Sequence, residues 1–154
     1  MASEPLHIVC FGNELHGDDG FGPAVHARLA ATALPADVRL MRADLAGLAA
    51  IGCFDGCRAA IVVDAIRGFG PPGSLHELDA TAIAAGAADE ADSGFHGAGV
   101  GSLLRLLPAA LERVPPIRLV GAEIAHLAAF SPGLSAPVAA AVEQAAARIR
   151  ERWA

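Results

Sequence analysis

Strand-like and helix-like segments alternate along the chain, and this alternation constrains the fold more than any other feature. Short apolar or alternating runs predict strands at residues 7–11, 38–42, 59–64, 74–78 and 117–122. Helical periodicity fills the gaps between them, at about 24–34, 45–53, 100–114 and 138–153. Strands that alternate with helices favour a parallel sheet covered on both faces. The expected fold is therefore α/β, a three-layer αβα sandwich around a central, mostly parallel sheet of about five strands.

Local signals refine this expectation. The run AAIVVD at 59–64 is typical of a central strand, whereas SLHEL at 74–78 follows the turn-forming GFGPPGS and predicts an edge strand that can run antiparallel. Ser135 is expected to cap the last helix, with Pro137 in its first turn. Pro108 is expected to kink its helix or split it in two. The stretch from 81 to 101 is expected to be the weakest structurally, with Asp89, Glu90 and Asp92 giving a mobile loop. No repeat or linker divides the chain, so we expect a single domain spanning residues 1–154.

The composition excludes several classes of function. All 11 positively charged residues are arginines, so a Schiff-base lysine, a Walker-A lysine and a lysine base are ruled out. The formal charge of −6, with arginines scattered along the chain, leaves no basic patch for nucleic acid. No window of about 18 residues is free of charge, proline and clustered glycine, which argues against a membrane span.

The ends and the cysteines point to the cytoplasm. The opening MASEPLHIVCFG has no basic region of the kind that begins a signal peptide. Three cysteines without a C-x-x-C pair suit a reducing compartment better than a disulfide framework, and Cys10, Cys53 and Cys57 are expected to be packing residues. We therefore expect a cytoplasmic protein, monomeric, whose partners are small molecules, metals or proteins.

A glycine-rich turn carries the first candidate residues. The segment GNELHGDDGFG at 12–22 lies between the first predicted strand and the first predicted helix, but it lacks the order G-x-G-x-x-G. Its two carboxylates also stand where a pyrophosphate would need bare N–H groups. One carboxylate is explained by capping of the helix start, and we assign that role to Asp18. Asp19 is then left to point into the crevice above the sheet.

Asp64 closes the AAIVVD run. In open α/β sheets, ligands bind outside the carboxyl ends of strands, where the winding direction reverses. If the strand order begins 2-1-3, the first and third strands are neighbours about 5 Å apart, and Asp19 and Asp64 face one another. Two close carboxylates repel unless a cation or a shared proton lies between them. The alternative is that Asp64 is only a turn residue.

His96 is the candidate nitrogen ligand. It lies in the glycine-flanked loop SGFHGAG just before a predicted helix, where an exposed imidazole suits ligation better than packing. His16 is close enough to the first turn to support the site, whereas surface or packing roles are expected for His7, His26, His76 and His126. Asp19, Asp64 and His96 form an O,O,N set that fits Zn²⁺, Ni²⁺ or Mn²⁺ and leaves positions open for a substrate group.

At these residues the sequence resembles the endopeptidases that mature [NiFe]-hydrogenase large subunits. The resemblance rests on FGNELHGDDGFG, IVVDAIRGFGPPGSLHELD, FHGAG, VGAEI and GLSAPVAAAVEQA, which cover nearly the whole chain in the right order. It implies a single-domain αβα sandwich with metal-recognising residues at Asp19, Asp64 and His96. It also implies an aspartic-type, nickel-dependent endopeptidase that removes the C-terminal extension of a nickel-loaded large-subunit precursor. The nickel comes with the precursor, and no organic cofactor is expected.

One departure from the family pattern and two alternative functions stay open. Family members often carry an Asp-Gly-Gly-Thr turn after the second strand, where this chain has RADLAG at 42–47, and the difference bears on which hydrogenase is recognised. The first rival is a non-catalytic nickel-sensing chaperone or checkpoint protein for the same precursor. The second is a small nucleotide-binding domain, which the missing glycine fingerprint disfavours. No Ser-His-Asp, Cys-His or H-E-x-x-H arrangement is present, and the group that activates water is open, with Asp18 one possible base.

Overall fold

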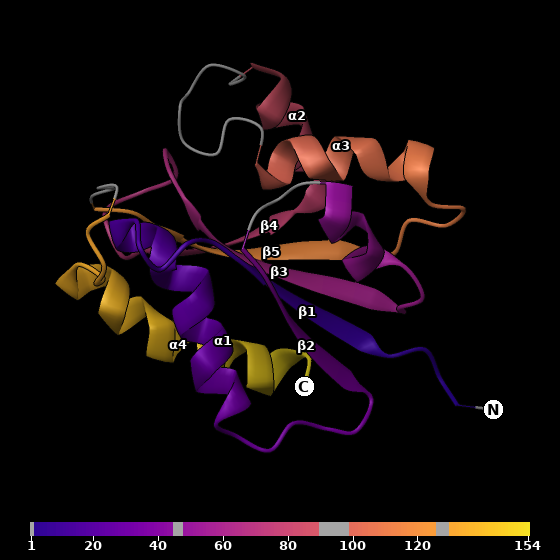
Figure 1. The fold of residues 1–154 in the computed structure, drawn as a ribbon, viewed down its shortest axis with the longest axis horizontal. Helices are drawn as coiled ribbons and strands as arrows, with labels where there is room; N and C mark the ends of the chain where they lie inside the picture. The colour runs from indigo at the N-terminus through magenta and orange to yellow at the C-terminus, as the bar shows by residue number, and fades with distance from the viewer. Residues whose placement is uncertain (1, 45–47, 90–98, 126–129) are drawn as a thin grey trace.

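A five-stranded sheet forms the middle layer of the described part of the protein (Figure 1). The computed structural model describes residues 2–44, 48–89, 99–125 and 130–154. The strands are β1 (Leu6–Phe11), β2 (Val38–Ala43), β3 (Ala59–Ile66), β4 (Leu75–Asp79) and β5 (Ile117–Glu123). The helices are α1 (Phe21–Ala30), α2 (Ala80–Asp89), α3 (Val100–Ala110) and α4 (Ala136–Arg152), with short 3-10 helices η1 (Gly17–Gly20) and η2 (Leu48–Phe54).

The strand order is β2-β1-β3-β5-β4, and every neighbouring pair is parallel except β4 with β5. This confirms the α/β fold, the 2-1-3 beginning and the antiparallel edge strand at 74–78. In β3 the residues from Ala60 to Ile66 are buried, as a strand in the middle of a sheet requires. The order reverses between β1 and β3, so the carboxyl ends of these strands form the edge where a crevice is expected.

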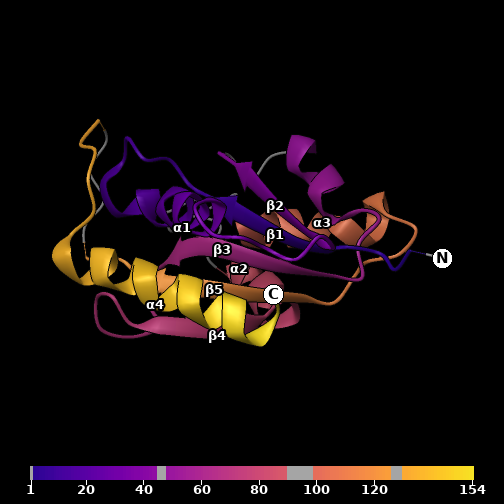
Figure 2. The same ribbon diagram turned by 90° about the horizontal axis from the view of Figure 1, so that it is seen from below.

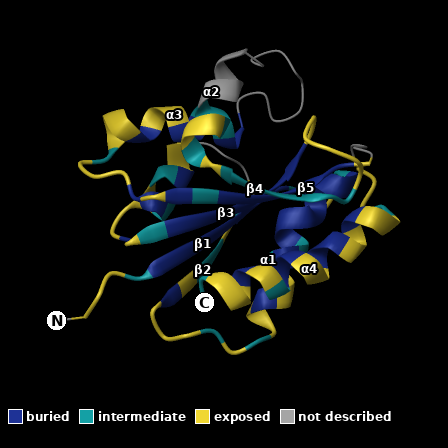
Figure 3. Cartoon of the chain, turned by 180° about the vertical axis from the view of Figure 1, so that it is seen from behind, coloured by how far each residue is buried: buried dark blue, intermediate teal, exposed yellow. Residues whose placement is uncertain are grey.

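Helices cover both faces of the sheet, and each face has its own apolar core. Figures 1 and 2 show α1 and α4 on one face and α2 and α3 on the other. Ile8, Ile61 and Val120 pack toward α1 and α4, whereas Val9, Val62 and Leu119 pack with α3 and η2. The alternation follows from the two-residue period of a strand. Seen from behind, the strands are mainly buried, and the outer faces of α1 and α4 are exposed (Figure 3).

The structure refines three expectations about helices. Residues 80–89, in the stretch expected to be the weakest structurally, form helix α2, because they are rich in alanine, the residue with the highest helix propensity; of the residues expected in a loop, Asp89 ends this helix, and Glu90 and Asp92 lie outside the described residues. Of the two effects expected of Pro108, a split is contradicted, because α3 continues past it to Ala110. The helix expected at 45–53 is a 3-10 helix over 48–54 in the described residues.

Candidate active site

Two glycines allow the loop after β1 to fold tightly back over the end of the strand. Gly12 has φ +135°, and a Cβ placed on it would lie 2.1 Å from the carbonyl oxygen of Asp19. A Cβ on Gly22 would lie 1.8 Å from the carbonyl oxygen of Phe11. Only glycine can occupy these positions without moving the backbone. The glycine-rich turn therefore serves close packing, and it holds η1 at the carboxyl end of β1.

Asp19 is fully buried in this loop. The backbone N–H of Asn13 donates a hydrogen bond of 2.9 Å to its Oδ2, and the N–H of Asp19 donates to the carbonyl of His16 at 3.1 Å. A carboxylate buried in this way is held in one orientation by backbone groups. Asp19 thus lies in the loop at the carboxyl end of β1, and its orientation toward a crevice stays a prediction.

Asp18 has a different role from the one expected. It is fully buried, and its carboxylate accepts hydrogen bonds from the N–H of Ala125 at 2.8 Å and from the N–H and hydroxyl of Ser135 at 2.7 and 2.9 Å. The N-cap position of α1 belongs to Gly20, which makes no side-chain cap. The expected capping role was therefore wrong: the bonds of Asp18 tie the first loop to the two ends of the loop between β5 and α4.

Ser135 is likewise not a side-chain cap. Ser135 occupies the N-cap position of α4, but its hydroxyl makes no cap hydrogen bond. Pro137 lies in the first turn of the helix, as expected. The Ser135 hydroxyl donates instead to the buried carboxylate of Asp18 at 2.9 Å, a charge-assisted hydrogen bond.

Asp64 lies within β3, two residues before its end, and not at the end of the strand. Its side chain is buried, and the N–H of Ala65 donates to its Oδ1 at 2.9 Å. Residue 64 is paired with Gly121 of β5, and the η1 helix that carries Asp19 packs against β3. The structure thus brings the Asp19 loop and the Asp64 strand together at the same edge of the sheet.

The charge of Asp64 is felt across the neighbouring strand. Burial raises the pKa of the Cys10 thiol in β1 to about 12, and the negative charge of Asp64 adds to this, while Arg42 of β2 opposes it. Cys10 is buried, as expected for a packing residue, and all three cysteines are free thiols. An extra negative charge near this edge favours a bound cation for the same reason that it disfavours a thiolate.

His96, the third predicted ligand, and His126 lie outside the described residues. The described chain resumes at Gly99, and Val100 at the start of α3 packs in one apolar cluster with Phe11 and Ile66, which end β1 and β3. Within the described ranges, no three His, Cys, Asp or Glu side chains are grouped so that they could hold a metal ion. Asp19 and Asp64 are the two expected ligands that lie in the described residues, and their role in metal binding stays a prediction.

The other predicted histidines contact protein groups. Nδ1 of His7 is 2.8 Å from the carbonyl oxygen of Cys53, and Nε2 of His76 is 2.8 Å from the hydroxyl of Ser74. His16, which was expected to support the site, meets the ring of Phe130 edge-on with centroids 5.9 Å apart. The ring of His16 therefore contacts Phe130, which lies in the segment before α4.

Glu123 is a residue that the sequence reasoning missed. It ends β5 and is buried, and its Oε1 accepts the N–H groups of Gly68, Phe69 and Gly70 at 2.6, 3.0 and 3.4 Å. Its Oε2 is buried without a hydrogen-bond partner in the described residues. A carboxylate that gathers three successive N–H groups fixes the loop that leaves β3 just after Asp64. An acid at the end of the apolar run IRLVGAE was the signal that could have revealed it.

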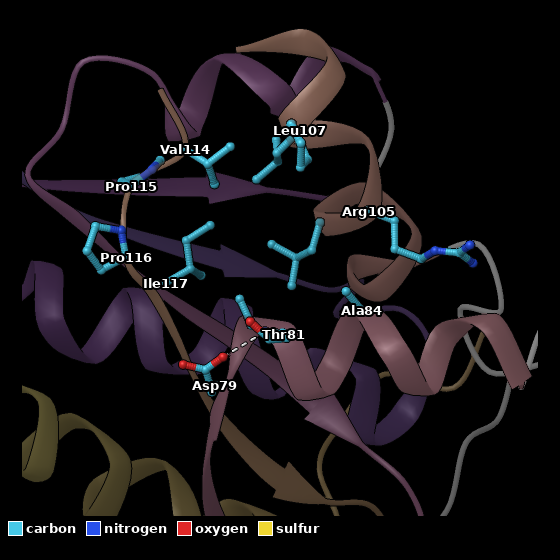
Figure 4. A pocket seen from close by; sticks show the side chains of 12 residues that line it. Asp79, Thr81, Ala84, Arg105, Leu107, Val114, Pro115, Pro116 and Ile117 are labelled. Atoms are coloured by element: carbon cyan, nitrogen blue, oxygen red, sulfur yellow. Dashed lines mark hydrogen bonds between the residues drawn. The ribbon is translucent and has the colours of Figure 1, made fainter. Parts of the chain in front are cut away.

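A pocket of about 340 Å³ lies at the opposite edge of the sheet. Side chains from the end of α3, the Val114–Pro116 segment and the start of β5 surround it (Figure 4). Asp79 on its rim accepts the N–H of Thr81, which lowers the pKa of that carboxyl. Its walls are mainly apolar, and it is remote from Asp19 and Asp64.

In the described residues, no helix is long and apolar enough to cross a membrane.

Comparisons with known proteins agree with this geometry. The model of a family described as hydrogenase maturation protease matches residues 23–152. The chain is similar in structure to the hydrogenase maturating endopeptidase HybD of Escherichia coli, with 24% identity, a TM-score of 0.82 and coverage of 97% of this chain and 94% of that one. It is similar to a hydrogenase 2 maturation peptidase of a Thaumarchaeota archaeon, with 28% identity, a TM-score of 0.64 and coverage of 96% and 97%. No curated protein sequence matches the chain.

Proposed function

Since the chain belongs to the hydrogenase maturation protease family, we propose that it removes the C-terminal extension of a nickel-loaded [NiFe]-hydrogenase large-subunit precursor. The observation that carries the proposal is the pair of buried carboxylates, Asp19 and Asp64, at the carboxyl edge of the sheet. Buried carboxylates are costly unless a cation or hydrogen bonds compensate them. Asp19 and Asp64 each accept a backbone hydrogen bond, and we propose that a divalent metal that arrives with the precursor adds to this compensation.

The chemistry of the donor set fits nickel better than a harder cation. Asp19 and Asp64 offer carboxylate oxygens, and His96, four residues before the start of α3 at Val100, offers an imidazole nitrogen. Three protein ligands leave coordination positions for groups of the substrate. We propose that these residues grip the precursor's nickel and thereby hold the scissile peptide beside a polarised carbonyl or water.

The test is cleavage of a purified precursor, followed by the mass of the large subunit. We expect a mass loss equal to the C-terminal extension for nickel-loaded precursor and none for nickel-free precursor. Equal cleavage of both forms would refute the nickel requirement. Tight binding of the nickel-loaded form without any mass change would instead support a chaperone or checkpoint protein.

Variants test the ligands one by one. Asp19→Asn and Asp64→Asn remove a negative charge with little change of shape, and His96→Ala removes the nitrogen donor, so each is expected to reduce cleavage by at least about a hundredfold, as for other lost groups of a catalytic unit. Asp55→Asn, an exposed site after η2, is the matched control and should cleave normally. A folded Asp19→Asn protein that retains cleavage within a few-fold of the unmodified protein would remove Asp19 from the site.

A further inference from the structure

Phe130 is held in a costly conformation and stays exposed. Among the described non-glycine residues, it alone has a positive φ, +58°, a conformation that crowds the Cβ of any L residue. Its side chain is 83% exposed, so little of the ring packs against the rest of the protein. Strain of this kind persists only when the surrounding structure enforces it, and it gathers at functional sites.

The surrounding structure does enforce it. The carboxylate of Asp18 binds both ends of the loop, at Ala125 and Ser135, and the N–H of Gly17 donates to the carbonyl of Ser131 at 2.8 Å. The ring of His16 contacts the ring of Phe130 edge-on. A β-bridge between His16 and Ser131 places the described segment before α4 beside the loop that follows β1. The exposed ring thus lies next to the loop that carries Asp19.

Leu15 extends the apolar surface at this point. It precedes His16 in the chain and is half-exposed, and we define Leu15, His16 and Phe130 as the Phe130 surface. The N–H of Asp19 donates to the carbonyl of His16, so the surface adjoins the proposed metal-binding residue through one hydrogen bond. Leu15 and Phe130 are large apolar side chains that stay exposed beside the proposed reaction centre. Such a surface is typical of a contact with a protein partner.

The charge near the Phe130 surface favours one kind of binding partner. The nearby buried carboxylates of Asp18, Asp19 and Asp64 make this edge negative, and the whole chain carries a formal charge of −6. An acidic segment would be repelled there, whereas an apolar segment that brings a metal cation alongside would be favoured. We infer that the Phe130 surface docks an apolar stretch of the substrate protein next to the bond that is cut, an inference that rests on the proposed function.

The experiment measures binding and cleavage separately. Phe130→Ala, Phe130→Leu and the control Leu106→Ala, an exposed leucine on α3, are compared for the dissociation constant and for KM and kcat with nickel-loaded precursor. We expect Phe130→Ala to raise the dissociation constant and KM by about tenfold or more with kcat within twofold, as for loss of an anchoring aromatic side chain. Phe130→Leu should recover most of the loss, and Leu106→Ala should change neither constant.

Several outcomes would overturn the inference. If Phe130→Ala binds the precursor within twofold of the unmodified protein while that protein cleaves normally, the surface is not the docking site and the proposed function stands. If the unmodified protein neither binds nor cleaves the precursor, both ideas fail. If sedimentation shows that the protein forms a dimer that Phe130→Ala dissociates, the occupant is a second copy of this chain and the assignment to the substrate is wrong.

Discussion

Replacing Asp18 with asparagine separates two explanations of a carboxylate at a helix start. A capping residue tolerates the change, because asparagine caps as well as aspartate. The observed role does not tolerate it. Oδ1 accepts the N–H of Ser135, and Oδ2 accepts the N–H of Ala125 and the Ser135 hydroxyl, so both oxygens face donors. An amide has one oxygen, and its NH₂ group must then face a backbone N–H.

The magnitude follows from the groups left without an acceptor. Asp18 is fully buried, so water cannot replace the lost bond, and one unsatisfied buried N–H costs about 1–3 kcal/mol. We expect Asp18→Asn to lower the free energy of unfolding by about 2 kcal/mol. In a domain of this size that corresponds to a fall of roughly 4–8 °C in Tm. Asp18→Ala leaves two backbone N–H groups without an acceptor and should cost about 4 kcal/mol.

Denaturant and thermal unfolding of the purified variants measure these losses, with Asp55→Asn as the exposed control, expected within about 0.5 kcal/mol of the unmodified protein. A double-mutant cycle of Asp18→Asn with Ser135→Ala should give a coupling energy of about 0.5–3 kcal/mol, since the two side chains share a hydrogen bond. If Asp18→Asn unfolds within about 1 °C of the unmodified protein, the hydrogen bonds to the 125–135 loop do not stabilise the fold, and the capping interpretation returns.

Other predictions concern stability. Because burial raises the pKa of Cys10 to about 12 from 9.0, the folded protein keeps a proton that the unfolded chain loses, so stability present below pH 9 should fall by up to about 1.4 kcal/mol per pH unit as the pH rises toward 12. The chain has no lysine or tyrosine, but burial also raises the pKa of Cys53 and Cys57, so Cys10→Ala should lessen the decline in pH-dependent unfolding without abolishing it. Glu123→Ala should cost about 2–4 kcal/mol and Glu123→Gln under about 1.5 in denaturant titrations, because one amide oxygen can keep the three N–H bonds while Oε2 has no described partner to lose. Phe130→Gly should raise the free energy of unfolding by about 1 kcal/mol, since glycine relieves the strain at φ +58°, and an unchanged or lower Tm would contradict that.

The fold was predictable because its signals are local. Apolar runs, the turn chemistry of GFGPPGS and the period of the last helix each report on a few neighbouring residues, and the structure confirms the strand order they suggested. The errors also have local causes. The glycines and charges that follow the alanine-rich residues 80–89 make this stretch look weakly structured in the sequence, although it forms α2. Strand β3 continues two residues past Asp64 because Ala65 and Ile66 are apolar.

The site was only partly predictable for a different reason. Asp19 and Asp64 could be found, since each stands at a recognisable place in a strand-and-turn pattern. The backbone partners of Asp18 and Glu123 could not be predicted, because backbone N–H groups carry no side-chain signal. Asp18 binds groups 107 and 117 residues away in the chain, and Glu123 binds groups 53 to 55 residues away. A motif of a few residues cannot reveal contacts between residues that lie so far apart in the chain.

The place of β5 in the sheet has a consequence for how the protein folds during synthesis. β5 lies between β3 and β4, yet it follows both in the chain. Until Ile117–Glu123 leaves the ribosome, β4 lacks its strand partner, and one side of the buried strand β3 is an open edge with unpaired N–H and C=O groups. Open apolar edges promote aggregation. A nascent or truncated chain that stops before residue 117 therefore depends on chaperone protection, and the order of the strands makes the last quarter of translation the step that closes the sheet.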